Sequence, residues 1–211
     1  MRGAACMRDV PDWALEALCW QAGLQYVAGM DEAGRGALAG PVSVGVVILP
    51  TDTALLRTLE GVRDSKQMTP LERARLAPRI RSISLAWAVG LASADEIDRL
   101  GIVRAVQMAG MRAVTALGRT PDFLLCDFRL LLPELETPQM ALVKGDQKSL
   151  SIAAASVLAK TARDALMCEL DAQYPGYGLA RHKGYGTAAH RMAISRLGPT
   201  DIHRRSFIHP R

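Results

Sequence analysis

Four acidic residues stand after runs of apolar residues that are typical of buried strands. Asp31 and Glu32 follow one such run, Asp127 follows a second, and Asp146 follows a third. An ionised carboxylate at the rim of a sheet gains nothing from burial and must find a cation or hydrogen-bond donors. Taken singly, each acid is better explained as a helix cap or as the partner of an arginine. Their joint placement at strand ends instead predicts a single chemical site.

Such a site would bind a divalent cation. If the strands that carry Asp31 and Asp127 are neighbours, their ends lie ~4.8 Å apart. Like charges at ~4 Å repel by roughly 4 kcal/mol at an effective dielectric constant near 20, so the cluster must raise its own pKa values or recruit a cation. Oxygen ligands favour Mg²⁺ or Mn²⁺ over zinc. Because consecutive strand residues point to opposite faces, Glu32 joins the site only if the strand has ended, as Gly34 permits.

A glycine-rich turn follows the first pair of acids. Gly34, Gly36 and Gly40 form G-x-G-x-x-x-G, one residue too long for the dinucleotide fingerprint, and Pro41 and a strand follow instead of a helix. Backbone N–H groups of such a loop can approach a sugar-phosphate closely, and Arg35 can meet a phosphate. A plain tight turn would also use these glycines.

The elements that must position these residues form an α/β pattern. Apolar runs predict five strands, over residues 26–30, 42–49, 84–92, 123–127 and 139–145. The fourth run has no polar alternation, which predicts a central strand covered on both faces. Helices are expected over residues 12–22, 70–81, 93–117 with a break at Gly101, from 149 onward, and over 188–197. We therefore expect a five-stranded mixed sheet flanked by helices, with a helical C-terminal extension.

The charge of the chain is concentrated at one end. The 211 residues carry a net charge of +5, and 49% of them are hydrophobic, as in ordinary globular proteins. From residue 179 to residue 211, seven Lys and Arg residues face one acid, Asp201. This basic end suggests a surface that binds a polyanion, although clustered arginines are more often a solvated surface. No run is long enough to span a membrane, and acids interrupt the first 20 residues, so we expect a soluble, cytoplasmic protein.

Cysteine and histidine spacings indicate no metal site and no disulfide framework. The cysteines are far apart and are expected to be free thiols, and the histidines are expected to be hydrogen-bonded or exposed. These residues are Cys6, Cys19, Cys126, Cys168, His182, His190, His203 and His209.

Together the motifs closely resemble bacterial type 2 ribonuclease H (ribonuclease HII). They are DEAGRG, DSK at residues 64–66, the acid Asp127, KGD at 144–146, SIAAASVLAK followed by Arg163-Asp164, YPGYG, HKGYGT and GPTDIHRRSF. The match runs from about residue 27 to residue 207. Any one of these motifs is weak, but so many in one order are specific.

The resemblance implies a ribonuclease H-like fold and a two-metal nuclease. The four catalytic and metal-binding carboxylates would be Asp31, Glu32, Asp127 and Asp146, holding two Mg²⁺ or Mn²⁺ ions. Members of the family cut the RNA strand of RNA–DNA hybrids. They also cut on the 5′ side of single ribonucleotides in duplex DNA, leaving 3′-hydroxyl and 5′-phosphate ends, which implies a role in removing ribonucleotides from DNA.

Further residues match the part of the family that binds the substrate. The loop of Gly34, Arg35 and Gly36 would sense the 2′-hydroxyl, and Tyr185 would stack on the neighbouring sugar. Other nucleic-acid contacts are assigned to Ser65, Lys66, Lys160, Arg181, Lys183, Arg191 and, as a further candidate, Arg204.

The chain departs from the family at Phe128, where a glycine is usual, so the turn after Asp127 is expected to differ or to be strained. Arg163-Asp164 is interpreted as a structural ion pair or cap. We also expect a monomer with three parts: an N-terminal helical extension (1–25), a catalytic domain (26–172) and a basic helical segment (173–211).

Two other functions remain open from the sequence. One is a catalytically inactive protein of the same fold that binds RNA–DNA duplexes, against which the four intact acids argue. The other is a related nuclease or integrase acting on DNA, which would lack the GRG and HKGYGT pair.

Overall fold

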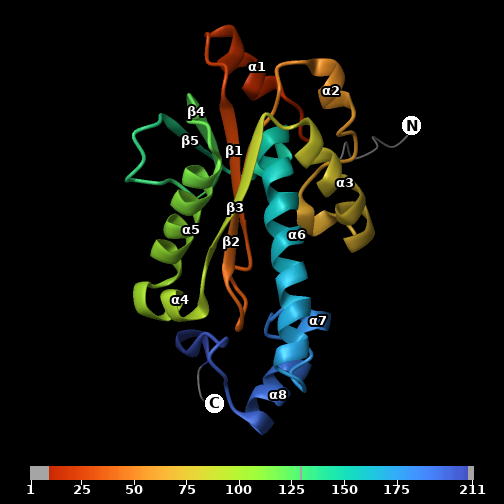
Figure 1. Cartoon of the computed structure of the whole chain (residues 1–211), viewed down its shortest axis with the longest axis vertical. Coiled ribbons are helices and arrows are strands. Elements are labelled where there is room, and N and C mark those ends of the chain that lie inside the picture. Colours follow the sequence, from red (N-terminus) through yellow and green to blue (C-terminus); the bar gives the residue numbers. More distant parts are fainter. Residues whose placement is uncertain (1–9, 129, 209–211) are drawn as a thin grey trace, which may run out of the picture.

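A five-stranded mixed sheet forms the centre of the molecule (Figure 1). The computed structural model describes residues 10–128 and 130–208, so Cys6, His209 and Arg211 lie outside the described residues. The strands lie in the order β3-β2-β1-β4-β5. Their bounds are β1 Val27–Ala33, β2 Val42–Ile48, β3 Ala86–Ala92, β4 Phe123–Asp127 and β5 Gln139–Leu142. The mixed sheet expected from the sequence is confirmed.

The pairing brings the end of β1 beside the end of β4. β1 pairs with β2, and β2 with β3, in antiparallel fashion, whereas β1–β4 and β4–β5 are parallel. β1 holds the middle position, and β4 is an interior strand between β1 and β5. β4 is covered on both faces, as the sequence predicted, because Leu124 and Leu125 belong to clusters on opposite sides of the sheet.

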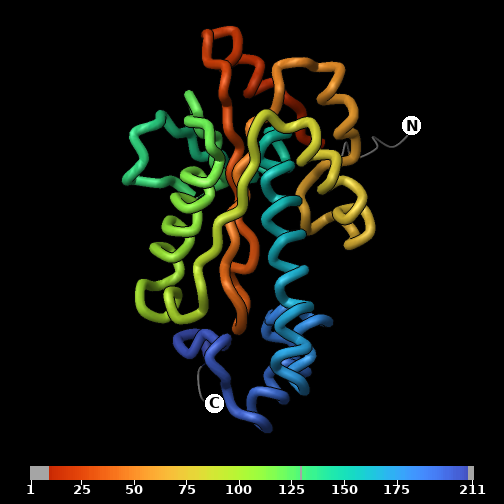
Figure 2. The backbone as a smooth tube through the Cα atoms, in the orientation of Figure 1, coloured from red at the N-terminus to blue at the C-terminus, as the bar shows by residue number. Residues whose placement is uncertain are grey.

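The two faces of the sheet are covered by different helices. On one face, Ala28 and Met30 pack with residues of α5 (Ile102–Ala116). On the other face, α6 (Leu150–Gln173) passes so close to Gly29 that an added Cβ would lie 2.1 Å from the Ser151 carbonyl carbon. This alternation is the period-two pattern of a strand that is buried on both sides. Figure 2 shows α6 continuing past the sheet, where α7 (Leu179–His182) packs against it.

Local capping signals set the helix boundaries. α3 (Pro70–Ile83) begins with a capping box of Thr69 and Glu72, and α4 (Ala94–Leu100) begins with the box of Ser93 and Glu96. Gly101, with φ of 77°, separates α4 from α5, as the sequence predicted. The remaining helical elements are α1 (Ala14–Gln21), α2 (Thr53–Arg57), α8 (Ala188–Leu197) and the 3-10 turns η1 (Ser65–Gln67), η2 (Gly145–Gln147) and η3 (Arg205–Phe207).

The first helix caps the N-terminus of α6. Glu16 of α1 is fully buried, and its Oε1 accepts hydrogen bonds from the Ser149 hydroxyl (2.6 Å), the Ser151 hydroxyl (2.6 Å) and the Ser151 N–H (2.9 Å). A carboxylate at this end of α6 also interacts favourably with the helix dipole. Residues far apart in sequence are thereby joined where α6 meets the sheet.

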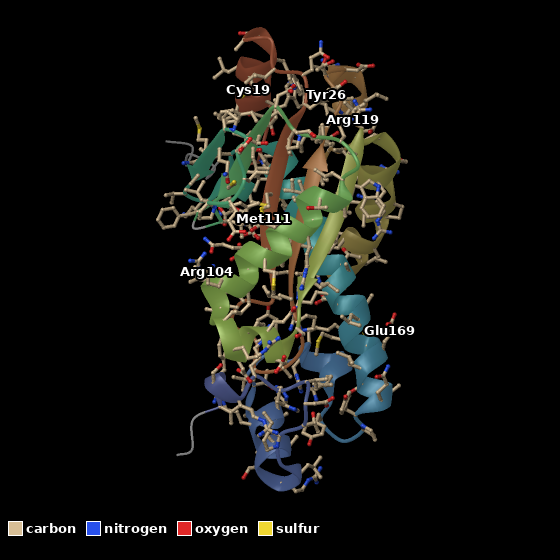
Figure 3. The ribbon with its side chains drawn as sticks, turned by 60° about the vertical axis from the view of Figure 1, so that its left-hand side comes forward. Cys19, Tyr26, Arg104, Met111, Arg119 and Glu169 are labelled. Carbon is tan, nitrogen blue, oxygen red and sulfur yellow. The ribbon has the colours of Figure 1, made fainter. Side chains whose placement is uncertain are left out.

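The C-terminal segment closes one end of the molecule, below the sheet in Figure 1. It pairs with the chain between β1 and β2: Leu38 N–H donates to the Gly184 carbonyl (2.8 Å), and Gly40 N–H donates to the Ile202 carbonyl (2.8 Å). At the opposite end, Arg119 lies over the Tyr26 ring at 4.5 Å (Figure 3). None of the helices among the described residues is long and apolar enough to cross a membrane. Cys19, Cys126 and Cys168 are free, as expected.

Candidate active site

The structure brings Asp31, Glu32 and Asp127 together at the ends of β1 and β4. Each offers one carboxylate oxygen, and these oxygens lie within 4.8 Å of one another. Met30 is paired with Cys126 in the parallel register, so Asp31 and Asp127 come next along two neighbouring strands. Their side chains therefore leave the sheet on the same face. The expectation that neighbouring strands would bring these two acids together is confirmed.

Glu32 reaches the cluster although the strand does not end before it. β1 continues to Ala33, which pairs with Ser43 of β2, so the expectation that the strand must stop at residue 31 is wrong. The pairing of β1 with β4 does stop at Met30. Beyond that point β4 no longer pairs with β1, and the Glu32 carboxylate lies with those of Asp31 and Asp127.

Asp146 is linked to the cluster through a turn. β5 ends at Leu142, earlier than the sequence suggested, because Lys144 adopts a left-handed conformation (φ 54°) and the turn η2 follows. The Gly145 N–H donates to Asp127 Oδ1 (2.8 Å), which fastens this turn to the end of β4. Asp146 lines the same pocket of about 410 Å³ as Glu32, Asp64 and Asp127. Asp64 is a fifth acid at this place, and the sequence analysis gave it no role.

The electrostatics of the cluster favour a bound cation. Burial, and then the charges of Glu32 and Asp127, hold the pKa of Asp31 well above its usual range. Burial also raises the pKa of Glu32, although Arg35 opposes this shift from 3.6 Å. Burial and the neighbouring Asp64 and Asp127 charges raise the pKa of Asp146 to about 6.

Two oxygens of the cluster have no donor among the described residues. Asp31 Oδ2 and Glu32 Oε2 are buried and accept no hydrogen bond there. An ionised buried oxygen without a partner is costly, and a divalent cation would satisfy it. Lys66 is a positive group in the same pocket: burial lowers its pKa, but the charges of Asp31, Asp64 and Asp146 outweigh this effect and the net shift is upward. The donor set is composed of oxygens, which suits Mg²⁺ or Mn²⁺.

Two loops lie beside the acids. Ala37, just after the GRG turn, forms a β-bridge with Tyr185, so the GRG turn and the HKGYGT loop are adjacent. Gly34 has φ of +88°, and an added Cβ would lie 1.9 Å from Arg163 Nε, so no other residue fits without displacing that arginine. Arg163 in turn lies under the Tyr185 ring, with Cζ 5.4 Å from its centroid.

Comparisons with known proteins agree with this geometry. The family model for ribonuclease HII matches residues 28–209. A ribonuclease HII from Dehalococcoides mccartyi is 49% identical and covers 93% of this chain and 92% of its own length. One from Thermus thermophilus is also 49% identical, with 92% and 91% covered. The chain belongs to the ribonuclease HII family. It is therefore a type 2 ribonuclease H, a hydrolase that cleaves RNA internally.

Solved structures of the family share the fold. The ribonuclease H2 from Pyrococcus horikoshii superimposes with a TM-score of 0.67 at 28% identity, covering 85% of this chain and 92% of that one. The ribonuclease HII in a complex with PCNA from Archaeoglobus fulgidus gives a TM-score of 0.71 at 25% identity, covering 88% and 96%. The ribonuclease H-like fold expected from the sequence is confirmed.

The residues assigned to nucleic-acid binding fall into separate places in this protein. Lys160 Nζ lies 5.4 Å from the Tyr185 ring centroid and pairs with Asp164. The Ser65 hydroxyl is buried and accepts a hydrogen bond from Ser156. Arg181 is exposed and lines another groove, with Tyr177, His182, Met192 and Arg196.

Lys183 and Arg191 point back to the protein, and Arg204 is buried. The Lys183 ammonium donates to the Ala180 carbonyl, and Arg191 Nε donates to the Gly186 carbonyl (3.1 Å). Arg204 has no exposed surface and donates to the Gly40 and Arg35 carbonyls, so its assignment to a phosphate contact is wrong.

Arg163 and Asp164 form structural contacts, as the sequence predicted, although they do not pair with each other. Asp164 pairs with Lys160 (2.7 Å) and Arg73 (3.3 Å). Arg163 is buried and donates to the carbonyls of Pro41, Ala39 and Lys183. Consecutive helix residues point in different directions, which is why one arginine faces the loops and its neighbour faces α3.

Phe128 is accommodated without a strained backbone. Among the described residues, only Lys144 and Lys183 have positive φ without being glycine. Phe128 therefore does not adopt the conformation that a glycine would allow, and its side chain is about half exposed at the rim of the acidic pocket. The backbone at Phe128 is thus not strained.

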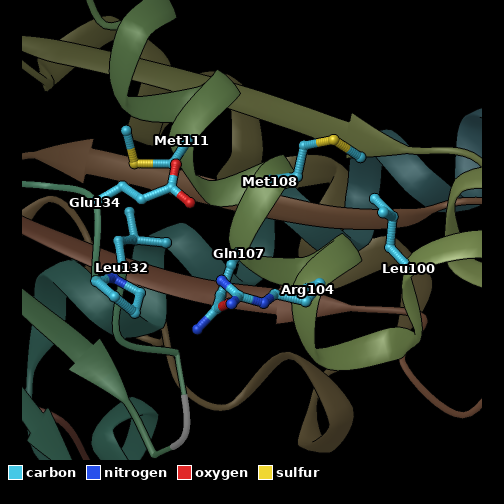
Figure 4. A pocket seen from close by; sticks show the side chains of 8 residues that line it. Leu100, Arg104, Gln107, Met108, Met111, Leu132 and Glu134 are labelled. Carbon is cyan, nitrogen blue, oxygen red and sulfur yellow. The ribbon is translucent and has the colours of Figure 1, made fainter.

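A second, apolar pocket lies away from the acids. It has a volume of about 320 Å³ between α5 and residues 132–134, and Figure 4 shows Met108, Met111, Leu132 and Glu134 around it. It contains none of the residues of the acidic cluster.

Proposed function

We propose that this protein hydrolyses the RNA strand of RNA–DNA hybrids and cuts on the 5′ side of single ribonucleotides embedded in duplex DNA. The products would be 3′-hydroxyl and 5′-phosphate ends, and the cellular role would be the removal of ribonucleotides from DNA. The observation that carries the proposal is the juxtaposition of the Asp31, Glu32 and Asp127 carboxylates with the GRG turn and the Tyr185 loop.

The carboxylates are the proposed metal ligands. Asp31, Glu32, Asp127 and Asp146 would hold two Mg²⁺ or Mn²⁺ ions, which supply charge neutralisation and activation of water for phosphodiester hydrolysis. The buried oxygens of Asp31 and Glu32 that lack donors support this assignment. The Asp127 carboxylate would hold the turn of Asp146 in place through the Gly145 N–H.

The GRG turn and Tyr185 would read the substrate. Gly36 is exposed in the turn that follows the acids, so its backbone groups could hydrogen-bond the 2′-hydroxyl of a ribonucleotide, whereas Gly34 is buried against Arg163 and would shape the turn. Arg35, about one-third exposed, would meet a phosphate beside the scissile bond. Tyr185, held against the GRG turn by the bridge to Ala37, would stack on the sugar next to the ribonucleotide.

Basic residues would hold the duplex without reading its sequence. Lys66 and Lys160 lie near the acids and Tyr185, and Arg181 lies in a groove on the C-terminal segment. Ser65, Lys183 and Arg191 remain proposed contacts, for which small movements of side chains on substrate binding would be needed.

The decisive experiment compares three labelled duplexes in Mg²⁺ and in Mn²⁺. One is a DNA duplex with a single ribonucleotide, one is a long RNA–DNA hybrid, and one is all DNA. We expect the first to be cut at one site 5′ of the ribonucleotide, the hybrid to be cut at many sites, and the DNA to stay intact. Binding without cleavage would favour the inactive duplex-binding protein, and cleavage of the DNA duplex would favour a DNA nuclease.

A further inference from the structure

Three histidines form a connected group in the C-terminal segment. His190 has no exposed surface and His203 is 2% exposed. The His182 and His190 rings are stacked with centroids 4.3 Å apart, and the His190 and His203 centroids are 5.4 Å apart. The proposed function assigns no role to any of them.

The hydrogen bonds of the group fix the position of every ring proton. His203 Nδ1 accepts from the Thr200 N–H (3.0 Å), so in the neutral ring the proton is on Nε2. That proton points to His190 Nε2 at 3.3 Å, which must accept it. His190 therefore carries its own proton on Nδ1, which donates to the Tyr185 carbonyl at 3.1 Å.

The third ring holds the other side of the same loop. His182 Nδ1 accepts from the Gly184 N–H (3.2 Å), so His182 Nε2 donates to the Tyr177 carbonyl (2.9 Å). The His182 carbonyl accepts from the Tyr185 N–H (2.9 Å). Both backbone groups of Tyr185 are thus bonded to residues of the histidine group.

An added proton would break this arrangement. A proton on His203 Nδ1 would face the Thr200 N–H, and a proton on His190 Nε2 would face the proton of His203. His182 and Asp201 are titratable groups that act on these rings. Burial and the neighbouring His182 lower the pKa of His190 to about 4, and burial lowers the pKa of His203 although Asp201 opposes the shift.

From this chain of bonds we infer that His190 and His203 are positioning residues for Tyr185. They hold its backbone in the place from which the ring meets the sugar, and they do so only as neutral rings in one pair of tautomers. The inference rests on the proposed role of Tyr185 in recognising a ribonucleotide junction.

Two variants of His190 separate positioning from simple packing. In His190→Asn the side-chain amide nitrogen occupies nearly the position of Nδ1 and can still donate to the Tyr185 carbonyl, whereas His190→Phe fills the space but cannot donate. The readout is the ratio of kcat/KM on the single-ribonucleotide duplex to kcat/KM on the long hybrid. We expect His190→Phe to lower this ratio about tenfold and His190→Asn to keep it within about twofold. Equal ratios for the two variants would overturn the inference.

A spectroscopic measurement on the unaltered protein is independent of any variant. In protein labelled with ¹⁵N-histidine, long-range ¹H–¹⁵N correlation distinguishes the two neutral tautomers. We expect a proton on Nδ1 for His190 and on Nε2 for His203, with the pKa of His190 near 4 and that of His203 below its usual range. A His190 ring that carries its proton on Nε2, or that titrates with an ordinary pKa, would contradict the inference.

Tyr185→Ala separates this inference from the proposed function. If it leaves the cleavage ratio unchanged, the proposed junction recognition fails. If Tyr185→Ala lowers the ratio and His190→Phe does not, the proposed function survives and the positioning role of the histidines fails.

Discussion

The carboxyl cluster places several like charges where burial already disfavours charge. Asp31 is 2% exposed, and its pKa is raised by burial and by the charges of Glu32 and Asp127. Without a cation, the repulsion between these buried charges lowers the stability of the folded protein. The chemistry of the site nevertheless requires the charges. The function and the stability of the protein are therefore expected to respond in opposite directions to the loss of one charge.

Replacing Asp127 by asparagine tests this opposition. The asparagine side chain would still offer its Oδ1 to the Gly145 N–H, so the link to the turn of Asp146 is kept while one negative charge is lost. We expect Asp127→Asn to abolish cleavage and to raise the free energy of unfolding in EDTA by about 1 kcal/mol. Urea unfolding and the cleavage assay measure the two effects. Asp52→Asn, at the exposed N-cap of α2, is the matched control and should change neither; wild-type turnover by Asp127→Asn would remove Asp127 from the site.

The raised pKa of Asp146 gives the metal-free protein a pH dependence. A carboxyl group whose folded pKa is raised to about 6 stabilises the fold below its unfolded pKa and loses that contribution as pH rises through about 6. Asp146→Asn removes the group, so the stability it gains in EDTA should be larger at pH 7.5 than at pH 5, by roughly 1–3 kcal/mol. His190 contributes to the pH dependence of stability with the opposite sign. Because the unaltered protein and Asp146→Asn both contain His190, the difference between their unfolding free energies does not include this contribution. A gain that is equal at both pH values would show that Asp146 titrates normally.

Sequence reasoning found the residues of the acidic cluster but not those that orient them. The acids were recognised because each follows an apolar run, which is a local signal. Asp64 lies in a polar loop and shares a pocket with Asp146, next to η1, which packs against α6. The buried His190–His203 contact joins residues 13 apart, with the rest of α8 and a loop between them. Contacts of this kind depend on tertiary packing, which spacing along the chain does not encode.

At the scale of the elements, the position of helix α1 against α6 depends on one buried carboxylate. Glu16 accepts three hydrogen bonds from Ser149 and Ser151 at the start of α6. α6 also carries Arg163 and packs against β1, so this cap lies at one end of the helix that supports the site. Residues 1–25 were interpreted as an extension, and this contact gives part of that extension a structural role.

Glu16→Ala should reduce the stability of the whole protein. Its removal leaves two buried hydroxyls and the Ser151 N–H without this acceptor, which we expect to cost about 2–4 kcal/mol in the free energy of unfolding. Urea unfolding followed by circular dichroism measures it. Glu60→Ala, an exposed acid elsewhere on the surface, is the control and should stay within about 0.5 kcal/mol. If both variants unfold at the same urea concentration, the buried cap contributes nothing.

Most element boundaries followed from local signals, and the exceptions lie next to the site. α8 (Ala188–Leu197) and the break at Gly101 were predicted correctly. A threonine cap marks the start of α8, and a serine cap and Gly101 mark the two ends of α4. β1 runs on to Ala33 because β2 continues to pair with it, and β5 stops early because Lys144 turns left-handed. Neither effect has a signature in single-residue propensities.

At the scale of the whole molecule, two buried arginines join the C-terminal segment to the sheet. Arg163 reaches the carbonyls of Ala39, Pro41 and Lys183, and Arg204 reaches those of Gly40 and Arg35. The loop that carries Tyr185 and the loop that carries Arg35 are thus held in one arrangement by charged groups whose partners are carbonyls. Burial lowers the pKa of Arg204 to about 9, which reflects the free-energy cost of removing a charged guanidinium group from water.

The same segment leaves other basic groups on the surface, and these should govern the response to salt. Arg181 and Arg196 line one groove beside Tyr177 and Met192, whereas Arg204 is buried and contributes no contact. Each phosphate contact on a duplex adds about 0.9 to the slope of log affinity against log salt concentration. We expect the unaltered protein to show a slope of several units, and the double variant Arg181→Ala/Arg196→Ala to lose about 1–2 units while its affinity falls similarly on every duplex sequence. Binding is measured by fluorescence anisotropy in Ca²⁺ or EDTA, with Arg119→Ala at the opposite end of the molecule as the control. An unchanged slope in the double variant would place the duplex elsewhere, because a groove that touches no phosphate releases no counterions.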